Sequence, residues 1–225
     1  MIRQMLKKSF AAFGRRPFYM IGIRLLTPLL AALALFGFFF LPVAAVCVIW
    51  LLEAGLYILF LNAYSEEHVE LSQLFQAFRN WKTAKRILCG LGWQALHIFL
   101  WMLIPVVGWI FAIIKVYSYR LTLYILVTEP EIEAKQAIYV SENRTFGYRG
   151  IMFGVDVLAF TCPAVVVFLF GLLVNIHPLF SILVSVLALF FVLVVPPLYL
   201  LVHAGFATEL SAPREEVPPQ IPADF

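Results

Sequence analysis

The chain has 225 residues, of which 63% are hydrophobic and only 13% are charged, and its formal net charge is +3. Soluble domains are about half apolar and about a quarter charged, so a water-soluble globule of this size could not cover the apolar surface present here. The composition excludes a soluble enzyme, a disordered chain and a disulfide scaffold, and the small net charge gives no reason to expect a nucleic acid partner. Lipid is therefore the expected solvent for most of the chain.

An amphipathic segment comes first, with apolar residues at helical spacing from Ile2 to Phe13. The apolar run from Phe18 to Leu41 that follows is longer than the hydrophobic region of a typical signal peptide. We interpret it as an uncleaved first membrane span.

Six segments have the length and apolar character of a membrane-crossing helix, which needs about 20 predominantly apolar residues. The predicted spans are 18–40, 42–64, 87–104, 106–128, 150–175 and 179–204. Turns rich in proline and glycine join them into three hairpins. We predict an all-α integral membrane protein with one transmembrane domain over 1–210 and a disordered cytoplasmic tail over 211–225.

A short amphipathic segment precedes each hairpin, and such segments suit the membrane interface. The second carries Leu71, Leu74, Phe75 and Phe78 at positions i, i+3, i+4 and i+7. Glu66, Glu67 and His68 resemble metal ligands at a glance, but we favour acidic residues that begin this second helix after Ser65. The third segment leads to Ala137 and Ile138, and we expect Thr128 and Glu131 to form its capping box.

The chain can be interpreted as three copies of one unit, an interfacial helix followed by a hairpin. The alternative is that any protein built from hairpins needs polar connections on one side. The order of residues leaves both interpretations open.

Basic residues predict the orientation. Lys and Arg occur before the first span and between the hairpins, and none occurs in the three short turns. The positive-inside rule then places both termini in the cytoplasm. We expect the protein in the bacterial cytoplasmic membrane.

Five charged residues fall inside the predicted spans, where an ionised group costs about 2.5–3.5 kcal/mol at the bilayer centre unless it has a partner or water. They are Arg24, Glu53, Lys115, Arg120 and Asp156. Matched depth and opposite sign predict a central Glu53–Lys115 pair and a shallower Arg120–Asp156 pair, with Arg24 nearby. These residues form either a polar site or structural links between helices, and Arg24 could instead extend to the inner interface.

Other improbable residues have structural explanations. His97 and His203 lie within spans, where a histidine more often bonds a neighbour than binds a metal. Gly150 and Gly154 form a GxxxG pattern that permits close helix approach. The three cysteines lie far apart, in no metal or redox pattern. No catalytic motif and no cofactor fingerprint occurs, so we expect no enzyme activity, no metal and no cofactor.

Several motifs appear in a specific order between Tyr57 and Leu210. They are Leu74–Phe78, Trp101–Gly108, Tyr117–Tyr119, Tyr124–Leu126, Glu129–Ile132, Ala137–Ile138 and Ser141. In these residues the chain resembles a bacterial membrane family of unknown function (domain of unknown function 975), related to the membrane domain of some glycerophosphoryl diester phosphodiesterases. It departs from the family pattern over Glu142–Arg149. The resemblance implies a multi-span helical bundle with an aspartate near Asp156, and it supplies no catalytic residue.

Two functions follow from these observations. The first is a non-enzymatic accessory or scaffold protein that contacts membrane lipids, including anionic ones, through its basic interfacial segments, with a membrane-protein partner or self-association possible. The alternative is a small-solute transporter or channel that uses the intramembrane charges.

Overall fold

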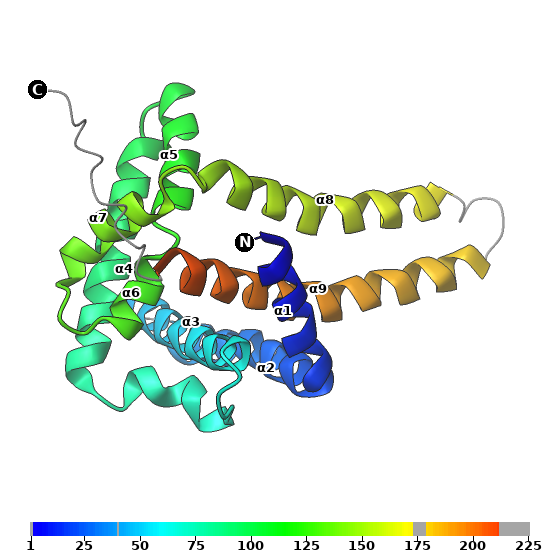
Figure 1. The fold of residues 1–225 in the computed structure, drawn as a ribbon, viewed down its shortest axis with the longest axis horizontal. Coiled ribbons are helices and arrows are strands. Elements are labelled where there is room, and N and C mark those ends of the chain that lie inside the picture. Colours follow the sequence, from blue (N-terminus) through cyan, green and yellow to red (C-terminus); the bar gives the residue numbers. More distant parts are fainter. Residues whose placement is uncertain (1, 40, 173–178, 212–225) are drawn as a thin grey trace, which may run out of the picture.

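The computed structural model describes residues 2–39, 41–172 and 179–211 (Figure 1). Over these ranges the chain is helical and contains no strand, as composition predicts. The elements are α1 (Ile2–Arg15), α2 (Pro17–Gly37), α3 (Pro42–Tyr64), the 3-10 helix η1 (Leu71–Phe78), α4 (Trp81–Met102), α5 (Val107–Ser118), α6 (Thr122–Thr128), α7 (Ala134–Thr145), α8 (Arg149–Leu172) and α9 (Leu179–Ser211).

Five segments in the described ranges are long and apolar enough to cross a membrane, and they make the chain a multi-pass membrane protein. They are Pro17–Gly37, Pro42–Tyr64, Val107–Thr128, Arg149–Leu172 and Leu179–Ser211. The predicted span 87–104 lies in α4, which is not among them. Polar side chains, including Arg86, Gln94 and His97, interrupt the apolar sequence of α4 and lower its hydropathy.

The hairpins point in different directions. Figure 1 shows α8 and α9 side by side, with the end of α8 and the start of α9 extending beyond the other helices, while α4 and α5 lie at a steep angle to this pair. Helix α1 lies across α9, and the Ser9 hydroxyl donates to the carbonyl of Leu201 at 3.3 Å. The fold is therefore not a single parallel bundle of six spans.

The core surrounds the second half of α3, which packs against η1, α2 and α9. Its largest fully buried side chains include Leu56, Leu59, Phe60, Leu74, Ile125, Leu126 and Phe206. Gly55 lets η1 approach α3 closely, because a Cβ atom there would lie 1.9 Å from the carbonyl oxygen of Leu74. By contrast, a Cβ atom on Gly150 or Gly154 would meet no described atom within 4 Å, so the predicted close packing at these glycines is wrong.

The second amphipathic segment differs from the prediction. It is a 3-10 helix that begins at Leu71, and only Leu74 and Ala77 on it are buried. The chain first turns at Glu66, where φ is 67°, so the acidic pair does not begin a helix. Instead, the Glu66 carboxylate pairs with Arg15 at 2.7 Å on the surface.

The predicted capping box before the third segment is also wrong. Thr128 is the last residue of α6, and its hydroxyl donates to the carbonyl of Tyr124 at 2.9 Å. Pro130 disfavours helical backbone at Glu129, so the chain leaves the helix there and α7 begins only at Ala134. Helix α9 continues to Ser211, beyond the predicted end of the last span. The predicted disordered tail, apart from Ser211, lies outside the described residues. So does the predicted turn between the last two spans.

The close approach of α3 and η1 gives a test. Replacing Gly55 by alanine should lower the free energy of unfolding by about 1–3 kcal/mol, because the new methyl group overlaps backbone that cannot move independently. Thermal unfolding in detergent micelles measures the loss. Gly154→Ala is the matched control and should cost nothing, since the site is open. Equal melting temperatures for the two variants would contradict this packing.

Candidate functional site

A break between α5 and α6 lies at the centre of the polar contacts. Helix α5 ends at Ser118 and α6 begins at Thr122, whose amide donates to Tyr119 at 3.0 Å and not to Ser118. The carbonyl of Ser118 and the amide of Leu121 therefore lack the partners that a continuous helix would provide. In an apolar environment each must find another partner.

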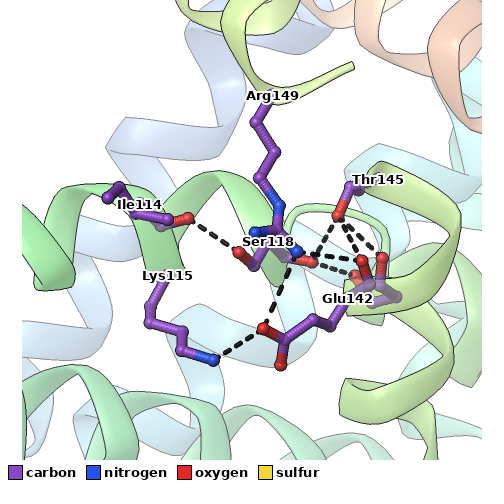
Figure 2. Close-up of polar contacts among 7 residues, drawn as sticks. Ile114, Lys115, Ser118, Glu142, Thr145 and Arg149 are labelled. Atoms are coloured by element: carbon purple, nitrogen blue, oxygen red, sulfur yellow. Dashed lines mark hydrogen bonds and ion pairs between the residues drawn. The ribbon is translucent and has the colours of Figure 1, made fainter. Parts of the chain in front are cut away.

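Two buried hydroxyls of α7 supply these partners. The Ser141 Oγ accepts from the amide of Leu121 at 3.1 Å and donates to the Ser118 carbonyl at 2.8 Å. The Thr145 Oγ1, one turn further along α7, lies 3.0 Å from the same carbonyl oxygen (Figure 2). Both side chains are fully buried. The break is thus a stabilised feature of the fold.

Lys115 pairs with Glu142 and not with Glu53, so the predicted central pair is wrong. Figure 2 shows the Lys115 ammonium directed at the Glu142 carboxylate, 2.6 Å away. Arg149 lies 3.7 Å from the same carboxylate and donates to the Glu142 carbonyl at 3.0 Å. The physical reason is register, since Glu142 follows Ser141 on α7 and so lies beside the last turn of α5.

Glu53 and Arg24 remain apart from these groups. Both side chains are half-buried, on α3 and α2 respectively. Neither has an ion-pair partner in the described part of the chain, and the Nε of Arg24 is buried without a hydrogen bond. Of the five predicted members, the structure therefore pairs Arg120 with Asp156, pairs Lys115 separately with Glu142, and leaves Glu53 and Arg24 without an ion-pair partner among the described residues.

Arg120 lies in the break and forms the predicted pair with Asp156 of α8. The guanidinium Nη1 is 2.5 Å from the Asp156 Oδ2, and the hydroxyl of Tyr117 donates to the same oxygen at 3.0 Å. The two charged side chains are 19% and 13% exposed. This pair is the ionic contact that matched depth and opposite sign predicted correctly.

Two residues of α9 complete the cluster. Arg120 also donates to the hydroxyl of Tyr199, and its Nη2 lies 2.9 Å from the Nε2 of His203. The same Nε2 lies 3.3 Å from the Asp156 Oδ1. A single ring nitrogen either accepts from Arg120 or donates to Asp156, so whether the His203 Nε2 carries a hydrogen decides which contact is a hydrogen bond.

The sequence contained a signal for these two residues. Tyr199 and His203 are one helical turn apart, which places two polar side chains on one face of an otherwise apolar helix. His203 bonds its neighbours, in line with the interpretation favoured for span histidines. His97 does the same, with its Nδ1 2.9 Å from the carbonyl of Trp93.

A cavity of about 430 Å³ opens beside this cluster. Its polar lining consists of Gln94, Tyr117, Tyr119, Arg120, Asp156 and Tyr199. Because Arg120 and Asp156 neutralise each other, the cavity offers hydroxyl and amide groups and no unpaired charge. Within the described ranges, no three His, Cys, Asp or Glu side chains lie close enough to hold a metal ion. The arrangement suits a small neutral polar molecule or water.

Two arginines hold the loop between α6 and α7. Arg86 of α4 donates to the carbonyl of Glu129 at 3.2 Å and also to those of Leu126 and Pro130. Arg144 forms a bidentate ion pair with the Glu129 carboxylate. The hydrogen bonds of this ion pair raise the pKa of the Arg144 guanidinium above its ordinary value. These contacts fix the position of α7 and therefore of the hydroxyls that cap the break.

Comparison of the chain with family models, with curated proteins and with solved structures found no match in any of the three. The family resemblance drawn from the sequence stays a prediction.

The revised pairing can be tested by removing one charge at a time. Lys115→Gln should lower the free energy of unfolding by about 1–3 kcal/mol, because it leaves the partly buried Glu142 with only the more distant Arg149. Glu53→Gln is the control and should change stability by less than about 0.5 kcal/mol, since Glu53 has no partner among the described residues. Thermal unfolding in detergent measures both. A larger loss for Glu53→Gln would restore the original Glu53–Lys115 pairing.

Proposed function

We propose that this chain is a non-enzymatic accessory or scaffold protein of the bacterial cytoplasmic membrane that contacts anionic lipids, with both termini in the cytoplasm. The observation that carries the proposal is the distribution of buried residues and exposed cations on α1. This helix buries Met5, Ser9 and Ala12 and leaves Arg3 and Lys7 exposed. A helix with an apolar face toward the protein and cations outside suits the surface of an anionic membrane.

The internal pairing of the polar cluster supports a structural role for it. Arg120 contacts an acid, a hydroxyl and an imidazole, and the Asp156 Oδ2 accepts from both Arg120 and Tyr117. A network of paired charges such as this one holds helices together in a medium where an unpaired charge is costly. The absence of any catalytic motif in the sequence favours the same conclusion.

The long helices α8 and α9 provide the surface for association. Each helix contains a stretch of 18 predominantly apolar residues of which none is buried. Such a surface is available to lipid, to a membrane-protein partner or to a second copy of the chain.

A second candidate is a small-solute transporter or channel, and one observation favours it. The cavity beside Arg120 contains hydroxyl and amide groups in a segment apolar enough to cross the membrane. Polar groups of this kind line paths for small polar solutes.

Reconstitution separates the two candidates. The purified protein should retain phosphatidylglycerol in preference to phosphatidylcholine from a mixed micelle, as counted by native mass spectrometry. Vesicles that contain the protein should be no more permeable to glycerol than empty vesicles in a stopped-flow swelling assay. If glycerol permeability rises, and Gln94→Phe abolishes the rise by filling the cavity, the transporter is correct and the accessory role is wrong.

A further inference from the structure

An apolar groove of about 390 Å³ lies between α1, α8 and α9, away from the break between α5 and α6. On α8 its lining extends from Val155 to Val166, a rise of about 16 Å along the helix axis. Leu6 and Phe10 of α1 form another wall, and Tyr199 of α9 lines both this groove and the polar cavity. The groove extends along α8 and is almost wholly apolar, which suits an acyl chain.

Two cations of α1 lie next to this groove. Arg3 and Lys7 precede Leu6 and Phe10 by three residues each, so each cation shares a helix face with a groove residue. Both are exposed, and neither has an acidic partner in the described part of the chain. Other cations of α1 are engaged, since Lys8 lies 4.6 Å from the centre of the Tyr64 ring and Arg15 pairs with Glu66.

We propose that this groove is a binding site for an anionic glycerophospholipid, with one acyl chain between α8 and α9 and the phosphate at Arg3 and Lys7. The inference rests on the proposed lipid-contacting function and assigns it a location. Charge complementarity selects the occupant. A second copy of the chain would bring α8 and α9 apolar surfaces to the groove and leave both cations unpaired, whereas a phosphate pairs with Lys and Arg.

Native mass spectrometry of the full chain in detergent, titrated with phosphatidylglycerol, tests the site. Arg3→Gln with Lys7→Gln should weaken binding about tenfold or more, because each cation near a membrane surface contributes to the attraction of an anionic head group. Arg79→Gln with Lys82→Gln is the matched control, since it removes two exposed cations elsewhere. The control should bind as the unmodified chain does.

A second pair of variants tests the acyl-chain part of the site. Ala159→Phe fills the groove and should weaken phosphatidylglycerol binding by a similar factor. Ala32→Phe adds the same side chain to an exposed position of α2 and should leave binding unchanged. Melting temperatures close to that of the unmodified chain establish that each variant is folded, and if Ala159→Phe fails this check, Val195→Phe, at another position that lines the groove, replaces it.

The outcomes separate this site from the broader proposal. The unmodified chain could retain phosphatidylglycerol while neither the α1 variant nor the groove variant weakens this binding more than its control does. The proposed lipid-contacting function would then stand, and the proposed location of the lipid would be wrong. If the unmodified chain retains no phosphatidylglycerol in preference to phosphatidylcholine, the proposed function itself fails. If Ala159→Phe changes the oligomeric mass without changing lipid binding, the groove is an interface between copies, and the proposal is overturned.

Discussion

The Ser118 carbonyl and the Leu121 amide constrain the whole polar interior. Both belong to an apolar segment, and lipid provides no hydrogen-bond partner for a backbone group that has left its helix. Ser141 and Thr145 of α7 supply the missing partners from a fully buried position. The chain can therefore turn at Tyr119–Leu121 without exposing unpaired backbone, and this turn is where Arg120 leaves the helix surface and reaches α8 and α9.

The ionic contacts follow from the position of α7 and α8 around this turn. Glu142 lies beside Ser141 and meets Lys115, while Asp156 meets Arg120 from the first half of α8. Lys115 is thus paired with an acid on α7, and Arg120 is paired with an acid on α8. In each contact the acid is engaged by a cation of the chain, and Arg149 shares the Glu142 carboxylate, so the polar cluster supports cohesion between helices more strongly than it supports chemistry. The exposed cations Arg3 and Lys7 lie elsewhere, on α1, next to the apolar groove lined by α8 and α9.

Much of the architecture could be predicted because apolar runs and their turns are local properties of the sequence. The α2–α3 hairpin and the starts of α8 and α9 follow from them, and matched depth with opposite sign predicted the Arg120–Asp156 pair. Depth fails for Lys115 because its partner, Glu142, lies outside the predicted spans, on α7, which packs against α5. The polar residues of α4 and the one-turn spacing of Tyr199 and His203 are visible in the sequence, but the groups they contact are not. The break at Tyr119 depends on Ser141 and Thr145 of α7, a contact between distant segments that no periodicity along the chain reports.

The Ser141 hydroxyl that caps the break holds Arg120 in position for Asp156, and a double-mutant cycle measures this coupling directly. Unfolding free energies in detergent are compared for Ser141→Ala, Asp156→Asn and the combination of the two. If the cap positions Arg120, the combined loss should be smaller than the sum of the single losses by about 0.5–3 kcal/mol, the range seen for coupled sites. Ser185→Ala, which removes a hydroxyl that bonds only within α9, should add to Asp156→Asn without coupling. Simple additivity for Ser141→Ala with Asp156→Asn would show that the break and the ion pair are independent, and would contradict the account.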